Sequence, residues 1–467
     1  MLTELRIKNF KAWKDTGLVR MAPLTVIFGA NSAGKSSLGH LLLALKQTTL
    51  LSDRKRALHL GDKSSLIDLG TFSDCLYGHD LNTALEFSLN WQLASPLTVK
   101  NSLDRRQSFA GKSISLSSCI KAGKNYQPEV ESIQYQLLNA GNPVLEVDHG
   151  RTESGAVTLD AEPLKLVKAA GRQWSLEPPE KFYRFSDVTL ARYQNAGFLA
   201  DFALETERML GSLYYLGPLR KHPERTYQWS GDTPSDVGAQ GEFTIAALLA
   251  ASADGRKLNR GPRRSQQEFG PFIASWLKDL GVISSFHVKP VAEGRKEFEV
   301  LIKTHASAPE VKLTDVGFGV SQVLPALVEA FYAPPNSMVW MEQPEIHLHP
   351  QVQAELADVF ISAVQARDEN SKPRNVQLIV ESHSEHFLTR LQRRVAENLI
   401  SPDDVAVYFC KRSETGAELE PLKLNLYGEI ENWPENFFGD EMTDVTARTL
   451  AAMRRKIEER KAQAASS

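Results

Sequence analysis

The chain has 467 residues, of which 42% are hydrophobic, and its formal net charge is −3. Length and composition allow about three domain-sized units with a substantial core, and the charge excludes a uniformly basic nucleic-acid binder. Its cysteines, Cys75, Cys119 and Cys410, lack the spacing of a zinc site or a disulfide framework, which favours reduced thiols. No apolar run approaches the roughly 20 residues that span a bilayer, so we expect a cytoplasmic protein without membrane contact.

The first 50 residues predict two strands and a helix. Residues 2–10 alternate apolar and polar side chains, as an edge strand does, and residues 24–28 form a short apolar run that ends at a glycine. Leucines then recur at helical spacing from residue 38 to residue 45. The order is therefore a buried strand, a glycine-containing loop and a helix.

The middle of the chain has a different texture. Residues 80–190 alternate in the manner of an antiparallel sheet, with two strands expected around residues 139–142. Residues 194–280 are predicted to be mainly helical, with loops at 217–241 and 254–265.

Beyond residue 286, predicted strands and helices alternate. The apolar runs at 339–341 and 376–380 are each followed by a long helical segment, which indicates a parallel sheet. From residue 441 the chain is predicted to form one amphipathic helix that ends in charged residues.

The segment Gly29–Ser36 matches the phosphate-binding pattern G-x-x-x-x-G-K-[ST], between a predicted strand and a predicted helix. Its glycines let backbone N–H groups surround the phosphates, and the helix N-terminus adds positive potential. Lys35 is expected to reach the β- and γ-phosphates, and Ser36 to coordinate Mg²⁺. We therefore predict that ATP and Mg²⁺ bind to this segment, with contacts from Gly29, Ser32, Ala33, Gly34, Lys35, Ser36 and Ser37.

An apolar strand that ends in carboxylates provides the second motif. Residues 339–345 read Val-Trp-Met-Glu-Gln-Pro-Glu, and a P-loop protein needs an acid here to hold the water shell of the metal. Glu342 is the candidate for that role. His347 and His349 follow two residues apart and face opposite ways on an extended loop, which favours hydrogen bonding over zinc binding.

The second apolar strand, residues 376–380, is followed by Glu-Ser-His-Ser-Glu-His. A histidine just past a strand adjacent to that of Glu342 is placed to touch the γ-phosphate, so His383 is the candidate phosphate sensor. Ser384 is suited to cap the next helix, which Glu385 and His386 are expected to begin.

Residues 313–322 contain a second glycine-rich helix start, Leu-Thr-Asp-Val-Gly-Phe-Gly-Val-Ser-Gln. Such a helix N-terminus can bind an anion through its free N–H groups, and Ser321 adds a hydroxyl. One fold cannot easily bring two such starts to the same nucleotide, so this start is expected to serve the ATP of a partner chain. The alternative is a glycine loop that only caps the helix.

The order of these motifs resembles the ABC-type ATPase heads of the SMC, RecF and OLD group. It is more closely similar to bacterial AAA-family ATPases, several of which belong to antiviral defence modules. Residues 5–11 are also similar to the first strand of that group, and the resemblance covers about 1–50 and 310–390. It implies an α/β P-loop fold of the ABC-ATPase type, with a parallel core sheet, an antiparallel N-terminal lobe and a mixed β and helical middle insertion. The domains expected are 1–80, 81–285, 286–415 and an extension over 416–467.

The resemblance also implies a role for each matching residue. Within one chain, Lys35 and Ser36 are assigned to phosphate and metal binding, and Glu342 is assigned to support Mg²⁺. His383 is assigned as the switch histidine. Asn31 is expected to line the loop, and Lys11 to approach the nucleotide. The resemblance assigns Gly319, Ser321 and Gln322 to a signature segment that contacts the ATP of a second copy of the chain.

One position departs from the pattern of this group. Where many heads have Asp-Glu before the proline, this chain has Glu342 and Gln343. A glutamine can orient a water molecule but cannot accept its proton at neutral pH, so turnover is expected to be slow unless Glu345 serves as the base. The catalytic candidates are therefore Glu342, Gln343, Glu345 and His383. For the glutamine-loop residue of such heads, His79 and Asp80 are weak candidates.

The leading hypothesis is an ATP-driven switch, in which two heads close over two ATP molecules and alter a separate effector protein. The resemblance suggests DNA maintenance or defence against phage, and basic clusters such as Arg54–Arg56 leave direct DNA contact open. A nuclease of the OLD kind is the alternative, but residues 405–409 are not followed by the acidic pattern of a Toprim domain. A transporter subunit ranks lower, because the chain has no Leu-Ser-Gly-Gly-Gln signature.

Overall fold

The computed structural model describes residues 1–30, 32–104, 106–171, 175–261, 264–414, 416–434, 450–453 and 455. The amphipathic helix predicted from residue 441 lies outside the described residues, apart from 450–453 and 455.

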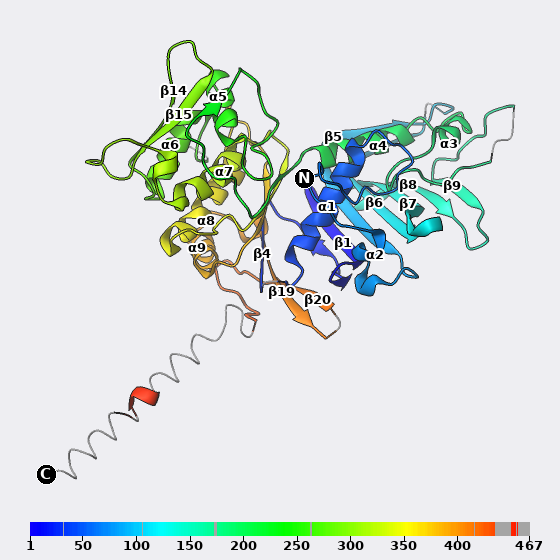
Figure 1. Ribbon diagram of the computed structural model, residues 1–467. Helices are drawn as coiled ribbons and strands as arrows, with labels where there is room; N and C mark the ends of the chain where they lie inside the picture. The colour runs from blue at the N-terminus through cyan, green and yellow to red at the C-terminus, as the bar shows by residue number, and fades with distance from the viewer. Residues whose placement is uncertain are drawn as a thin grey trace, which may run out of the picture.

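Six strands form the core sheet, which lies in the middle of the molecule between two lobes (Figure 1). Their order across the sheet is β10 (Leu213–Leu216), β17 (Met338–Glu342), β18 (Gln377–Glu381), β4 (Leu24–Gly29), β19 (Val405–Ser413) and β20 (Gly416–Leu422). The first five are parallel, and β20 runs antiparallel to β19. The predicted parallel sheet is confirmed, and β10 adds a strand inside a segment whose pattern predicts mainly helix.

A second sheet is antiparallel throughout and belongs to one lobe. Its strands are β2 (Trp13–Asp15), β1 (Leu2–Phe10), β5 (Leu85–Lys100), β6 (Ser108–Ala122), β7 (Pro128–Asn139), β8 (Asn142–Arg151) and β9 (Val157–Glu162), with β3 (Val19–Arg20) beside β1. The edge position predicted for residues 2–10 is wrong, because β2 and β3 pair with one side of β1 and β5 with the other. Alternation of apolar and polar residues shows which face of a strand is buried. It does not show how many neighbours the strand has, because strands pair within the plane of the sheet.

The helices divide between the two lobes, as Figure 1 shows. The lobe of the antiparallel sheet holds α1 (Lys35–Leu50), α2 (Phe72–Cys75), α3 (Asp187–Ala191) and α4 (Leu199–Gly211). The other lobe holds α5 (Thr244–Ala253), α6 (Phe269–Asp279), α7 (Phe318–Tyr332), α8 (Pro350–Gln365) and α9 (Glu385–Ala396).

Two small sheets complete the helical lobe. One consists of β11 (Tyr227–Gln228), β15 (Glu297–Lys303), β14 (Ser285–Pro290) and β16 (Val311–Lys312), and the other pairs β12 (Lys257–Leu258) with β13 (Gln267–Glu268). The predicted boundary at residue 80 falls between β3 and β5 of the antiparallel sheet, and the domain limits stay a prediction.

The core sheet separates two hydrophobic cores, because successive residues of a strand point to opposite faces. In β17, Trp340 packs with α1 and the antiparallel sheet, whereas Val339 and Met341 pack with α7, α8 and α9. Gly39 of α1 lies against the Trp340 indole, where an added Cβ would be 2.4 Å from the ring. This close packing fixes the start of α1 above the end of the sheet.

Candidate functional site

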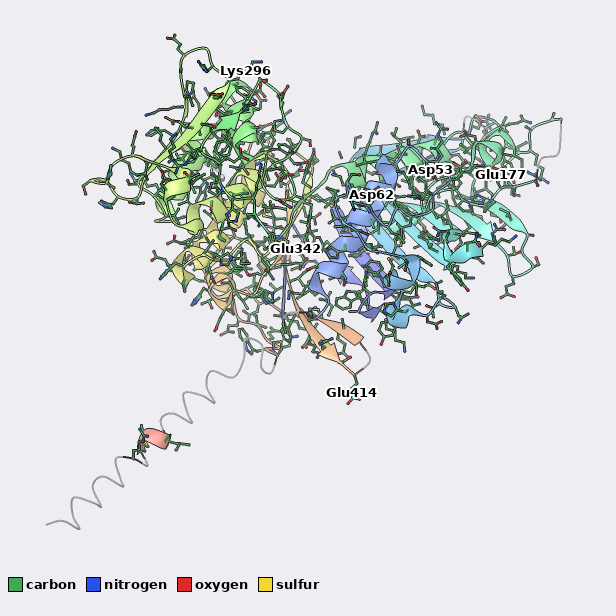
Figure 2. All side chains as sticks on the ribbon, in the orientation of Figure 1. Asp53, Asp62, Glu177, Lys296, Glu342 and Glu414 are labelled. Carbon is green, nitrogen blue, oxygen red and sulfur yellow. The ribbon has the colours of Figure 1, made fainter. Side chains whose placement is uncertain are left out.

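The predicted motifs meet at the carboxyl edge of the core sheet. Strand β4 ends at Gly29, β17 at Glu342 and β18 at Glu381. The strand register pairs Glu342 with Glu381, and Glu381 with Ile27. Figure 2 shows Glu342 near the middle of the molecule, where the two lobes meet. Motifs that lie more than 300 residues apart in sequence therefore form one site.

The phosphate loop needs glycine at two positions. Gly29 has a φ of 145°, and an added Cβ would lie 2.2 Å from the carbonyl oxygen of Cys410. Gly34 has a φ of 100°, caps α1, and lies against Ala12 and Ala417. These positive φ values favour glycine, and they turn the chain from β4 into α1.

Other predicted loop residues lie as follows. Ser32 is exposed and has a φ of 59°, and the carbonyl of the buried Ala33 accepts a hydrogen bond from the thiol of Cys410 at 2.9 Å. The Ser37 hydroxyl bonds to the carbonyl of Gly34 and accepts from the Trp13 indole at 2.9 Å. Ser37 thus connects the loop to Trp13 and stabilises its conformation.

Lys35 lies within the loop, with 6% of its surface exposed. Its Nζ donates to the carbonyls of Gly29 and Ala30, both at 2.8 Å. Burial lowers the pKa of Lys35, while the charges of Glu381, Cys410 and other nearby acids oppose that shift. An ammonium has three donors, so one N–H is left to bind a phosphate oxygen.

Two carboxylates lie beside Ser36. The Ser36 hydroxyl donates to Oε2 of Glu381 at 2.7 Å, and the Trp340 indole donates to Oε1 of the same carboxylate at 2.7 Å. Burial, followed by the charge of Glu342, raises the pKa of Glu381 to about 8. Glu381 is therefore largely protonated at neutral pH when no cation is bound.

Glu342 is held in its ionised form. Its Oε1 accepts from the Tyr215 hydroxyl at 2.8 Å and lies 3.6 Å from Nε2 of His40. Burial by itself raises the pKa of Glu342, but the contacts with His40 and Tyr215 bring it below its ordinary value. A hydroxyl and two carboxylates are hard oxygen ligands of the kind that Mg²⁺ prefers, so Ser36, Glu342 and Glu381 fit this ion.

The segment after Glu342 connects the two strand ends. Glu345 accepts from the Ser382 hydroxyl at 2.9 Å and from the backbone N–H of His383 at 2.6 Å, and burial raises its pKa. Gln343 has a φ of 45°, and its N–H donates to the carbonyl of Glu381 at 2.9 Å. Its half-buried side chain occupies the position where the resemblance expects a glutamate.

His383 is neutral in this environment. Burial, followed by the charge of Lys35, lowers its pKa to about 4. Its Nε2 is shielded from solvent and has no hydrogen-bond partner among the described residues. A neutral imidazole beside Lys35 can donate one hydrogen bond to a phosphate oxygen.

Some predicted residues lie outside this cluster. Lys11 donates from Nζ to the carbonyl of Leu69 at 3.1 Å, and Asn31 lies outside the described residues. His79 contacts the Ser73 carbonyl, and Asp80 accepts bonds from Asn82 within its own turn. His349 caps α8 and Ser384 caps α9, as the sequence predicts for Ser384.

The second glycine-rich start is the N-terminus of α7. Gly317 precedes the helix and supplies no side-chain cap. Gly319 is half-buried, and an added Cβ would meet only Leu348, at 3.9 Å. Ser321 and Gln322 each keep 7% of their surface exposed within a single chain. The accessible part of the predicted signature is therefore the backbone of its first turn.

Several residues at this sheet edge have no role in the sequence-based predictions. Glu381 follows an apolar strand in the same way as Glu342, and this signal was available. His40 lies four residues after Ser36 on one helix, and i,i+4 spacing puts both on one face. Tyr215 and Arg220 gave no local signal, because they reach the site through the pairing of β10 with β17.

Comparison with known proteins gives two family matches. Residues 256–388 match the family described as AAA ATPase domain, and residues 400–447 match a protein family of unknown function, DUF3696. The first match contains α7, Glu342, Glu381 and His383. No protein of curated function matches the chain.

Solved structures of SMC heads are similar to the chain at low identity. For the SmcHead bound to the C-winged helix domain of ScpA, identity is 13%, coverage is 91% of this chain and 98% of that chain, and the TM-score is 0.41. For the SMC head domain from Thermotoga maritima, the values are 11%, 90%, 99% and 0.39. For the Smc head domain with an extended coiled coil, bound to the C-terminal domain of ScpA derived from Pyrococcus furiosus, they are 10%, 91%, 96% and 0.40.

The phosphate loop, the core sheet and the AAA ATPase match together support an ATP-binding ATPase with a P-loop fold. Among the described residues, no helix has the length and apolar character that crossing a bilayer requires.

Proposed function

We propose that the chain is an ATPase head that binds ATP with Mg²⁺, closes with a second copy of itself around the nucleotide, and thereby switches a separate effector protein. The observation that carries this proposal is the meeting of Lys35, Ser36, Glu342 and His383 at one edge of the core sheet. Because three strand ends and one helix start converge there, the site has a cation, metal ligands and free N–H groups in one place.

Each residue has a role that follows from its contacts. Lys35 donates the N–H that the loop carbonyls leave free to a phosphate oxygen, and its charge attracts both the β- and the γ-phosphate. Ser36 and Glu342 hold Mg²⁺, with Glu381 as a further acid beside them. Bound Mg²⁺ supplies positive charge to the phosphates and favours ionisation of both carboxylates.

Dimerisation is proposed because the first turn of α7 is a second free helix start. Its backbone N–H groups point out of the helix end without a side-chain cap, and they suit the γ-phosphate held by another copy. Gly319 has no side chain, which leaves room for that approach. The nearly buried Ser321 and Gln322 then support the turn, and their exposed edges face the partner.

Hydrolysis is proposed to be slow. Gln343 can orient the attacking water but cannot take its proton at neutral pH. Glu345 is the alternative base, yet its Oε1 already accepts bonds from Ser382 and His383. A long-lived ATP state is useful in a switch, because closure can persist while the effector responds.

The effector and its setting rest on the motif resemblance alone. That resemblance favours DNA maintenance or defence against phage, with DNA as a further candidate partner. A salt titration of DNA binding tests the latter, since backbone contacts weaken steeply as salt rises.

ATP-dependent dimerisation tests the proposal directly. Sedimentation velocity of the wild type with Mg·ATP, with Mg·ADP and without nucleotide is expected to show a dimer only with ATP. Lys35→Ala is expected to stay in the nucleotide-free state under all three conditions. Identical assembly of the wild type with and without ATP would overturn the dimer model.

A further inference from the structure

Arg220 lies at the same sheet edge as the predicted site. Strand β10 pairs with β17 so that Leu216 is opposite Met341, and the chain then continues through Gly217 to Arg220. This turn is fixed at both ends, because Gly217 donates to the carbonyl of Ala239 and Lys221 to that of Gln240, both at 2.8 Å. The arginine is thus presented beside Glu342 by ordered backbone.

The guanidinium of Arg220 is buried and largely unpaired. The residue keeps 9% of its surface exposed. Its Nη2 donates to the backbone carbonyl of Glu342 at 3.4 Å, which is a long hydrogen bond. Nε and Nη1 are shielded from solvent and have no hydrogen-bond partner among the described residues. Most buried polar groups are bonded, so these two donors require an explanation.

The acids near Arg220 do not accept hydrogen bonds from its Nε and Nη1 atoms. Burial lowers the pKa of Arg220 to about 10, while Tyr215, Glu342 and Glu345 act in the opposite direction. The arginine therefore keeps its charge at neutral pH. Tyr215 and His40 contact Oε1 of Glu342, and Ser382 and the backbone of His383 donate to Oε1 of Glu345. Oε2 of Glu345 is buried without a hydrogen-bond partner among the described residues, so it does not pair with Arg220 either.

A structural role alone explains little of this arrangement. The Tyr215 hydroxyl already ties β10 to Glu342, through a shorter bond of 2.8 Å. Arg220 adds one weak bond to a carbonyl and brings an unpaired charge into a buried place, which is strongly unfavourable. A phosphate group removes that penalty, because its oxygens accept two parallel bonds from a guanidinium.

We propose that Arg220 binds the γ-phosphate of ATP from the side of β10, opposite Lys35, and so makes the site prefer ATP to ADP. This inference rests on the proposed ATP binding at the core-sheet edge. It assigns Arg220 to the terminal phosphate because the residue adjoins Glu342, which lies two strands from the phosphate loop on β4. The β-phosphate is served by Lys35 and the loop itself.

The test compares the affinities for Mg·AMP-PNP and Mg·ADP by calorimetry, in dilute protein. The matched control is Arg374, which is 1% exposed and also has Nε and Nη1 atoms without a partner among the described residues. It lies just before the first residue of β18, at the end of that strand away from Glu381. We expect Arg220→Gln to weaken AMP-PNP binding by about 10-fold while ADP affinity stays within about 2-fold. Arg374→Gln is expected to leave the ratio of the two affinities unchanged.

The outcomes separate the two proposals. Arg220→Gln with the wild-type ratio overturns the role of Arg220, and wild-type protein that binds neither nucleotide overturns ATP binding itself. Arg220→Lys covers the case in which Arg220→Gln does not fold. Lysine keeps the charge but not the two-pronged geometry, so a partial loss of the ratio is expected and an unchanged ratio contradicts the proposal.

Discussion

Helices α1 and α7 both begin after a glycine without a side-chain cap, yet their first turns have different surroundings. Lys35 and Ser36 open α1, and a buried pair of acids lies beside them. The first turn of α7 holds Gly319, Val320 and Ser321 and carries no charged side chain. One start has a cation, a hydroxyl and two acids beside it, and the other offers mainly its backbone.

This difference shows what a helix N-terminus can and cannot do. Free N–H groups and the helix dipole attract an anion, but the attraction is only about 0.3–1 kcal/mol at an exposed end. Tight binding of ATP needs a cation and metal ligands as well, and Lys35 and the proposed ligands Ser36 and Glu342 lie at α1. We infer that α7 acts as a complement to a nucleotide that is already bound elsewhere.

Removal of the cation at α1 should have the largest effect. Lys35→Ala is expected to weaken Mg·ATP binding at least about 100-fold, because the charge-assisted bond of its ammonium and the attraction of its charge for the phosphates are lost. Calorimetric titration measures this affinity. Lys46→Ala is the control, since Lys46 belongs to the same helix but donates to the carbonyls of Gly211 and Leu213. If Lys35→Ala and the wild type bind Mg·ATP with equal affinity, then the start of α1 is not the ATP-binding site.

A negative charge at the α7 start should remove its proposed role without harm to α1. Gly319→Asp is expected to weaken ATP-dependent dimerisation at least about 10-fold, because the carboxylate repels the partner's γ-phosphate. The fold should tolerate this change, since the new Cβ meets only Leu348 at 3.9 Å and an acid suits a first helical turn.

Sedimentation measures this dimerisation, and ATP affinity of the monomer should stay at the wild-type value. Gly197→Asp places the same charge at an exposed glycine with no atom within 4 Å of an added Cβ. If Gly319→Asp dimerises like Gly197→Asp, then α7 does not face the nucleotide of a partner.

A base at position 343 should accelerate hydrolysis. Gln343→Glu supplies a proton acceptor where the resemblance expects one, and we predict an increase in kcat of about 10-fold or more. Phosphate release at saturating Mg·ATP measures kcat. Glu345→Gln is the informative companion, because a large loss of activity there would identify Glu345 as the base that the wild type uses.

The sequence predicts the parts of the site that lie within one short motif. Gly29, Lys35 and Ser36 are neighbours in the chain, and their spacing alone fixes a loop followed by a helix. Glu342 and His383 are predicted to lie near the loop because each follows an apolar strand, and parallel strands bring their ends to one edge. Local pattern was therefore enough for these residues.

The remaining parts depend on pairing between distant strands. Strand β10 is only four residues long and lies in a segment with helical periodicity, so its place beside β17 is decided by tertiary packing. Tyr215 and Arg220 follow from that pairing, and no local pattern marks them. The interior position of β1 was missed for the same reason, because alternation is blind to the partners at a strand's two edges.

The last prediction concerns Glu381, the buried acid beside the start of α1. The pKa of Glu381 is raised from 4.5 to about 8, so the folded chain holds a proton that the unfolded chain releases. Its contribution to the free energy of unfolding is present below about pH 4.5 and is lost as pH rises through about 8. Without nucleotide, Glu381→Gln is therefore expected to raise Tm at pH 8 by about 3 °C or more, and to have little effect near pH 4.5.

Glu329→Gln separates this electrostatic effect from metal binding. Glu329 of α7 is also fully buried, and burial raises its pKa to about 8, so both variants should gain stability at pH 8. Only Glu381→Gln should lose part of the stabilisation that Mg·ADP gives the wild type, because Glu381 lies beside Ser36 and Glu329 does not. Thermal melts at pH 8 with and without Mg·ADP measure both effects, and equal Mg·ADP shifts in the two variants would mean that Glu381 takes no part in the metal site.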